Sequence, residues 1–257
     1  MLAVISPAKK LDEGRWRCSL PTTTPDHLTH SQTLIDTLKK LDTTALGALM
    51  KISESLSQLN HGRYHSFALP FTEENAKPAV MMFQGDTYQG LDAGSFSQED
   101  LAYAQSHLRI LSGLYGVLRP LDLIQPYRLE MGTRLANARG TNLYNFWQNL
   151  PVESLNQTLA EDAHPALINL ASNEYFKAVK SKELQAPLIT PVFKEIKGGQ
   201  AKVIGLMAKR ARGAMARFII QNRLSNTEDL KQFESGGYRY QAEQSSADAW
   251  LFTREAV

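Results

Sequence analysis

The sequence is poor in cysteine, with Cys18 as the single thiol among 257 residues. One cysteine cannot close an intramolecular disulfide, and a secreted domain of this size more often carries several pairs. We therefore expect a reducing, cytoplasmic location. Arg15 and Arg17 favour the thiolate of Cys18, but a peroxidatic cysteine usually needs a resolving partner, which only another molecule could supply. Redox sensing by Cys18 is kept as an alternative.

Long hydrophobic runs and familiar nucleotide-binding loops are also lacking. No stretch approaches the roughly 20 apolar residues that span a bilayer, and the opening MLAVISPAKKLDEG does not make a signal peptide. Neither the Walker-type phosphate loop nor Gly-x-Gly-x-x-Gly occurs. Low-complexity linkers and internal repeats are missing as well. We therefore expect one domain over residues 1–257, with no role at a membrane and no cofactor.

An excess of charge of one sign is absent overall, because the formal net charge is only +2. The charges are nevertheless segregated along the chain. Residues 177–223 contain eleven basic side chains against Glu183 and Glu195, which gives that segment +9 and leaves −7 on the remainder. Such a division can indicate an anionic partner, although a solvated basic face explains it equally well.

The pattern of apolar residues predicts a mixture of strands and helices. Short apolar runs at 2–6, 79–83, 166–170 and 188–193 are typical of buried strands. Helices are expected at 26–40, at 42–59, after the capping box that begins at Ser97, and at 141–159 with a break at Pro151. The elements follow no regular strand–helix–strand order, so we predict an α+β fold rather than a doubly wound parallel sheet.

The C-terminal third predicts two hairpins and one cationic helix. Gly198-Gly199 is typical of a tight turn in a hairpin over 193–207, and a second hairpin is expected near the C-terminus. On the intervening helix, apolar residues form one stripe. The opposite side carries the basic residues Lys209, Arg212 and Arg223, flanked by Arg210 and Arg217.

The segment at 98–130 resembles a helix-hairpin-helix element. Its centre is the run Ser112, Gly113, Leu114, Tyr115 and Gly116. In that motif the glycines let the chain reverse, and bare backbone N–H groups at the start of the second helix bind phosphate. The alternative is that Gly113 only ends a helix and Gly116 is a loop glycine. Pro120 would also shorten a second helix.

The residues that follow are too polar for ordinary core. Arg119, Asp122, Tyr127, Arg128 and Glu130 could form a charge-balanced cluster inside a cleft. The alternative is a network that ties irregular backbone together.

Several long blocks resemble those of the YaaA family of bacterial peroxide-stress resistance proteins. The blocks are SPAK at 6–9, FQGDTYQGL at 83–91, LRILSGLYGVLRPLDLIQPYRLEMGTRL at 108–135, NLASNEYFK at 169–177 and KRARGAMARFIIQNRL at 209–224. The resemblance implies a cytoplasmic bacterial protein that limits oxidative DNA damage and lowers unincorporated iron. It also implies a single mixed domain of the cantaloupe type, with a helix-hairpin-helix-like element beside a positively charged, DNA-binding cleft.

Metal ligation has weak support in the sequence. His61 and His65 have i, i+4 spacing, and His27 and His30 make a second pair. Neither pair has the neighbouring cysteine or glutamate of a recognised motif. We therefore expect no metal site.

Two functions remain open. The first is DNA binding that depends on DNA structure rather than base sequence, with duplex, single-stranded or junction-like DNA as partner and a monomer as the simplest state. The expected phosphate-binding residues are Ser112, Gly113, Leu114, Tyr115, Gly116, Arg119, Arg128, Lys177, Lys209, Arg210, Arg212 and Arg217. Exposed Tyr115, Tyr127 or Trp147 could stack on bases.

The second function is an enzyme acting on a nucleobase, nucleotide or other anionic small molecule in the same cleft. Its candidate catalytic residues are Lys9, Asp122, Glu130 and Glu174. A narrow cavity favours the enzyme, and an open groove favours binding of a duplex.

Overall fold

The computed structural model describes residues 1–14, 16 and 21–256. Cys18 and its neighbours Arg15 and Arg17 lie outside the described residues, and so does the redox alternative built on them. The described helices are α1 Leu28–Leu38, α2 Thr43–Met50, α3 Glu54–Ser66, α4 Ala79–Met82, α5 Asp86–Leu91, α6 Gln98–His107, α7 Leu143–Trp147, α8 Leu150–Ala160, α9 Asn173–Phe176 and α10 Gly205–Gln221. The described strands are β1 Leu2–Ile5, β2 Lys10–Leu11, β3 Lys77–Pro78, β4 Phe83–Gln84, β5 Leu108–Ser112, β6 Gly116–Leu118, β7 Leu123–Ile124, β8 Leu167–Leu170, β9 Leu188–Lys197, β10 Gln200–Lys202, β11 Arg239–Tyr240 and β12 Ala249–Glu255.

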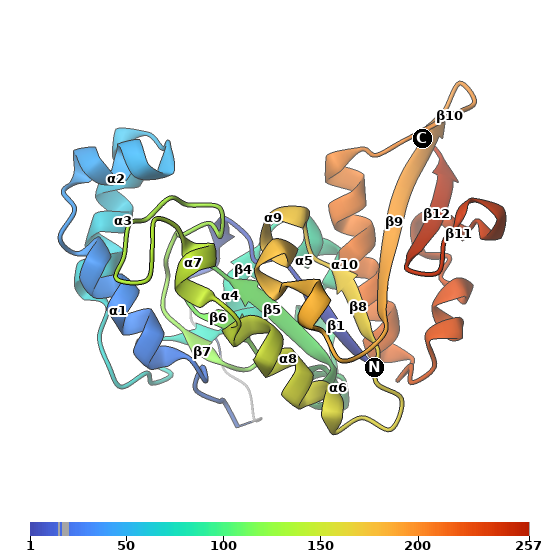
Figure 1. Cartoon of the computed structure of the whole chain (residues 1–257), viewed down its shortest axis with the longest axis horizontal. Helices are drawn as coiled ribbons and strands as arrows, with labels where there is room; N and C mark the ends of the chain where they lie inside the picture. The colour runs from blue at the N-terminus through green and yellow to red at the C-terminus, as the bar shows by residue number, and fades with distance from the viewer. Residues whose placement is uncertain (15, 17–20, 257) are drawn as a thin grey trace.

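A mostly parallel sheet forms the centre of the molecule (Figure 1). Its order is β11-β12-β9-β8-β1-β5-β6, with β10 paired to β9. The ladders β1/β5, β1/β8, β8/β9 and β9/β12 are parallel, whereas β5/β6, β9/β10 and β11/β12 are antiparallel. The predicted mixture of helices and strands is confirmed. The preference against a parallel sheet was wrong, because long helical connections join strands that lie side by side.

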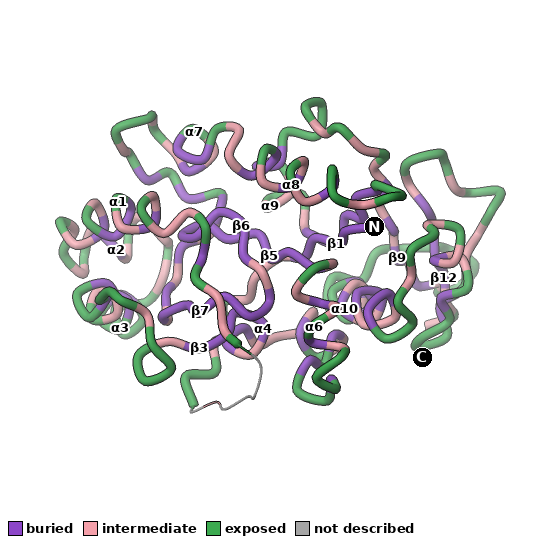
Figure 2. Tube along the Cα trace, turned by 90° about the horizontal axis from the view of Figure 1, so that it is seen from below, coloured by how far each residue is buried: buried purple, intermediate pink, exposed green. Residues whose placement is uncertain are grey.

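Strand β1 shows why both faces of the sheet are covered. All four of its residues are buried. Ala3 and Ile5 belong to one apolar cluster, to which α10 contributes, whereas Leu2 and Val4 belong to another, to which α8 contributes. Because side chains alternate along a strand, β1 packs helices on each side. Figure 2 shows β1, β5 and β6 as buried strands at the centre of the molecule.

Helices α5 and α10 cross in unusually close contact. A Cβ atom on Gly213 would lie 1.8 Å from the Thr87 carbonyl oxygen, and one on Gly90 would lie 2.0 Å from the Arg210 carbonyl oxygen. Only glycine at both positions permits this approach. The crossing fixes the middle of α10 against α5.

Local sequence signals predicted many element ends correctly. Asp42 accepts a hydrogen bond from Ala45 N at 2.8 Å to begin α2, and Ser97 and Asp100 form the expected capping box of α6. Both predicted hairpins, β9/β10 and β11/β12, are present. The run 79–83 was predicted as a strand, but it forms the short helix α4 before β4.

The helix-hairpin-helix prediction was wrong in its second half. Helix α6 ends at His107, and residues 108–118 form the antiparallel hairpin β5/β6 instead of a second helix. Residues 112–116 are all buried. Their turn is held from inside by Ser112 Oγ, which accepts a hydrogen bond from Tyr115 N at 2.9 Å.

The aromatic residues considered for base stacking belong to the core. Tyr115, Tyr127 and Trp147 are 0, 5 and 0% exposed. Trp147 Nε1 donates to the Gly113 carbonyl oxygen at 2.9 Å and so joins α7 to the turn of the β5/β6 hairpin. No helix in the described ranges is long and apolar enough to cross a membrane.

Candidate functional site: a basic pocket at the carboxyl ends of β1 and β8

A pocket of about 400 Å³ opens where β1 and β8 end. Open α/β sheets characteristically bind ligands outside the carboxyl ends of their strands. We call this cavity the basic pocket. Its lining residues are Ser6, Pro7, Ala8, Lys9, Lys10, Gln84, Gly85, Asp86, Thr87, Tyr88, Leu170, Ser172, Glu174, Tyr175, Lys209 and Arg212.

Hydrogen bonds between loops that are distant in sequence build the floor of the pocket. Ser172 N donates to Ser6 Oγ at 2.8 Å and joins the turns after β1 and β8. Tyr88 Oη donates to the Ser6 carbonyl at 3.1 Å and ties α5 to the same turn. Burial raises the pKa of the Tyr88 and Tyr175 phenols well above their ordinary value, so both are neutral hydrogen-bonding groups at pH 7.

Arg212 is the most informative side chain of the pocket. It is partly buried, and burial lowers its pKa from the ordinary value. Within the described residues, neither the Arg212 guanidinium nor the Lys209 ammonium has a hydrogen-bond or ion-pair partner. Arg217 is different, because its guanidinium is bound by the carbonyl oxygens of Leu91 and Asp92. Lys209 and Arg212 are therefore the cations of α10 that remain available to a ligand.

Two other predicted cations, Arg210 and Lys177, do not line the basic pocket and contact other side chains. Arg210 pairs with Asp86 at 3.5 Å. Lys177 is exposed beside α9 and lies over the ring of Tyr144, with 5.0 Å from Nζ to the ring centroid. The ion pair of Arg210 partly neutralises Asp86, an acid that lines the basic pocket.

Three candidates for acid–base chemistry lie in or beside the basic pocket, because Lys9 and Glu174 line it and Glu130 contacts Lys9. Lys9 Nζ lies 2.8 Å from Glu130 Oε2, and Arg128 Nη2 lies 3.1 Å from Glu130 Oε1. Glu174 accepts a hydrogen bond from Gly132 N at 2.9 Å. The structure thus brings together Lys9, Arg128, Glu130 and Glu174, which the sequence places in three separate blocks.

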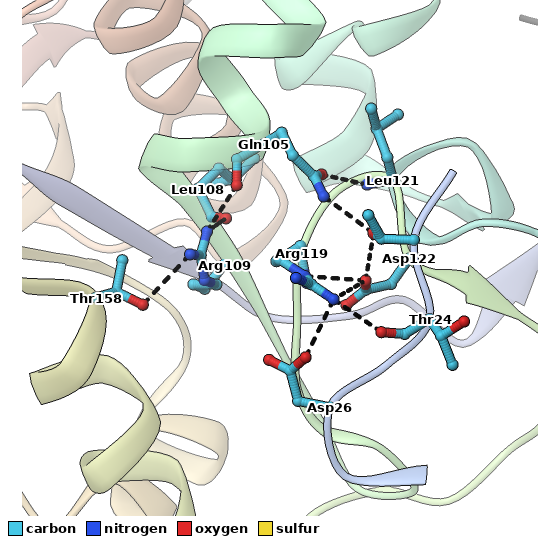
Figure 3. Close-up of polar contacts among 10 residues, drawn as sticks. Thr24, Asp26, Gln105, Leu108, Arg109, Arg119, Leu121, Asp122 and Thr158 are labelled. Atoms are coloured by element: carbon cyan, nitrogen blue, oxygen red, sulfur yellow. Dashed lines mark hydrogen bonds and ion pairs between the residues drawn. The ribbon is translucent and has the colours of Figure 1, made fainter. Parts of the chain in front are cut away.

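Asp122 and Arg119 lie elsewhere, in the cluster of Figure 3. Arg119 donates to Asp122 Oδ1 at 3.1 Å and to the Thr24 carbonyl at 2.8 Å, and it pairs with Asp26 at 3.1 Å. Asp122 also accepts from Thr23 Oγ1 at 2.6 Å. These contacts fasten the segment before α1 onto the sheet. The two cavities beside this cluster share no lining residue with the basic pocket, so the predicted cluster of Asp122 with Glu130 does not form.

The paired histidines also have packing partners. His30 stacks on Trp147 with ring centroids 6.1 Å apart, and His27 lies 6.0 Å from the same indole. His61 and His65 contact each other at 4.2 Å on α3.

Sequence reasoning missed Ser6, Gly85, Ser172 and Tyr175 as pocket residues. The available signal was their position, because Ser6 and Ser172 directly follow buried apolar runs that become parallel strands. Carboxyl ends of neighbouring parallel strands share one edge of the sheet.

The fold and the pocket define an α/β protein whose cationic site lies at the carboxyl edge of a mostly parallel sheet. The chain belongs to the family of the peroxide stress protein YaaA, whose family model matches residues 1–244. It is 59% identical over 257 residues to a UPF0246 protein of Magnetococcus marinus, with all of both chains covered. It is 56% identical over 255 residues to a UPF0246 protein of Cellvibrio japonicus, with 99% of each chain covered. A UPF0246 protein of Aliivibrio fischeri is 53% identical over 258 residues, with 99% of this chain and 98% of the relative covered. The family resemblance of the sequence blocks is thereby confirmed.

Proposed function

We propose that the protein binds DNA through phosphate groups in the basic pocket, in the bacterial cytoplasm, as part of the response to peroxide stress. The family supports the stress response. The pocket supports the DNA partner, because phosphate is the anionic group that nucleic acids present at every nucleotide.

The unpaired guanidinium of Arg212 is the observation that carries this proposal. Removing a cation from water without pairing it costs free energy, which a bound anion restores. Lys209 lies three residues earlier on α10 and lines the same pocket without a partner among the described residues. Together they offer an arginine fork and a point charge, the two side-chain types that bind phosphate best.

The pocket is too small for a duplex, which favours a small-molecule substrate and, among DNA partners, those with accessible strands. A volume of about 400 Å³ lies within the range of small-molecule sites, so one nucleotide fits and a duplex does not. Single strands, frayed ends and junctions present such a nucleotide without the cost of unpairing it. We therefore infer selection by DNA structure with little dependence on base sequence.

Fluorescence anisotropy with a labelled single strand, a duplex and a forked duplex tests this proposal. Arg212→Ala should weaken binding of the single strand about tenfold, equivalent to about 1.4 kcal/mol. The salt slope should fall by about 0.7 for the lost phosphate contact. Arg239→Ala removes an exposed arginine from β11, at the far edge of the sheet, and should change little. Equal affinities of wild type and Arg212→Ala for every probe would show that DNA does not bind in the basic pocket.

A second candidate function is an enzyme for a phosphorylated small molecule. The contact of Lys9 with Glu130 favours it, because an amine beside a carboxylate at a bounded cavity is an arrangement used for proton transfer. Glu174, which also lines the basic pocket, supplies a further carboxylate.

The substitution Glu130→Gln distinguishes the two functions. An enzyme that uses Glu130 for proton transfer loses turnover of a nucleotide substrate by about 100-fold or more while binding persists. A binding protein shows no turnover of nucleotides in either form. Product formation by wild type, followed by chromatography, distinguishes these outcomes.

A further inference from the structure

A smaller cavity of about 60 Å³ adjoins the basic pocket. Pro7, Ala8, Lys9 and Tyr175 line both spaces. The turn after β1, residues 6–9, therefore borders both cavities. The smaller cavity is completed by the segment from Tyr127 to Glu130.

Arg128 in this wall has a buried donor that nothing satisfies. Its Nε is buried and has no hydrogen-bond partner among the described residues, although Nη2 reaches Glu130. Buried N–H groups are almost always bonded, and leaving one unpaired is costly. The backbone here is held in place, because Tyr64 Oη donates to the Arg128 carbonyl oxygen. The unpaired donor thus belongs to a fixed segment.

Charge and volume limit what could satisfy that donor. Lys9 and Arg128 flank Glu130, so the three groups carry one net positive charge. A cavity of about 60 Å³ has room for a few water molecules or for phosphate oxygens, but not for a nucleobase. A positive wall and small size favour phosphate.

We propose that the ligand site continues past the turn of residues 6–9 and holds two phosphates, one at Arg212 and Lys209 and one at Arg128 and Lys9. The partner is accordingly a nucleic-acid strand with consecutive phosphates rather than a nucleoside monophosphate. This inference rests on the proposed function, and it identifies the ligand of the same site more narrowly. Arg128 and Lys9 bind the second phosphate, and Glu130 positions both cations.

Isothermal titration with two probes tests the inference. Thymidine 5′-monophosphate has one phosphate, and the dinucleotide pdTpdT has two. Wild type should bind pdTpdT at least tenfold more tightly. Arg128→Ala should weaken pdTpdT binding about tenfold and the monophosphate less than threefold, so the preference nearly disappears. The matched control Arg239→Ala removes the same charge from β11 and should keep the full preference.

The remaining outcomes separate this inference from the proposed function. If Arg212→Ala weakens both probes while Arg128→Ala leaves the preference intact, the two-phosphate site is wrong and the basic pocket stands. If Arg212→Ala changes neither probe, both are wrong. Arg128→Lys covers the case in which the alanine variant does not fold. It keeps the charge but lacks Nε–H and the planar fork, so the preference should fall at least threefold. A preference equal to that of wild type overturns the inference.

Discussion

Alanine at Gly213 should destabilise the protein, although alanine normally favours a helix. In a helix interior the replacement of glycine by alanine gains about 1 kcal/mol. Here the new Cβ would lie 1.8 Å from the Thr87 carbonyl oxygen and 2.7 Å from Leu91 N, so α5 and α10 must separate. Overpacking costs about 1–3 kcal/mol, and a clash with rigid backbone falls at the upper end. The expected net loss is about 2 kcal/mol.

Thermal unfolding followed by circular dichroism measures this effect. For a chain of this size, about 2 kcal/mol lowers Tm by roughly 4–8 °C. Gly62 in α3 is the matched control, because a Cβ there meets nothing within 4 Å. Gly62→Ala should raise Tm by roughly 1–4 °C. A rise of Tm in Gly213→Ala comparable to that of the control would refute the close crossing of α5 and α10.

Two other substitutions give expected outcomes. Asp122→Asn should lower Tm by roughly 2–12 °C, because about 1–3 kcal/mol of buried charge-assisted bonding to Arg119 is lost. Anisotropy should show unchanged DNA affinity. Asp12 has a pKa below its ordinary value of 3.8, mainly because Lys77 hydrogen-bonds to it. Its stabilising contribution is therefore present above pH 3.8 and is lost as the pH falls through the lower folded value. Asp12→Asn should be less stable than wild type at pH 7 in urea titrations, and the difference should vanish at the acid end. A gap that persists unchanged in acid would contradict this assignment.

Short-range signals predicted structure well because their cause is local. The side chain of Asp42 bonds to the third residue after it, so the sequence window contains the whole interaction. The helix-hairpin-helix prediction around Ser112 was wrong because the β5/β6 hairpin that forms there depends on a distant strand. The first strand of the hairpin, LRILS, fits a helix or a buried strand, and this strand pairs with β1, 105 residues earlier in the chain.

The sequence indicated some residues of the candidate site, but not which of them come together in the fold. Lys9 and Glu174 follow apolar runs that become neighbouring parallel strands, so their convergence is a consequence of sheet topology. Asp122 lies in an equally polar segment, yet its partner Thr23 comes from a part of the chain that no local pattern connects to it. Composition marked both segments as unusual, and only the fold showed that one lines the basic pocket and the other forms a structural network.

Part of the segregated charge of the sequence is paired within the fold. Three acids from the α5 and α6 region meet three arginines of α10 and its end, in the pairs Asp86–Arg210, Asp92–Arg217 and Asp100–Arg223. These pairs fasten α10 to its neighbours, so the net charge of residues 177–223 overstates what a ligand encounters. The cations that α10 leaves without partners in the described chain, Lys209 and Arg212, both line the basic pocket. Lys182, Lys194, Lys197 and Lys202 also have no ion-pair partner in the described chain, yet they do not line the basic pocket. The pocket therefore gathers the two unpaired cations of α10 and not the basic segment as a whole, whose other unpaired cations form a solvated surface.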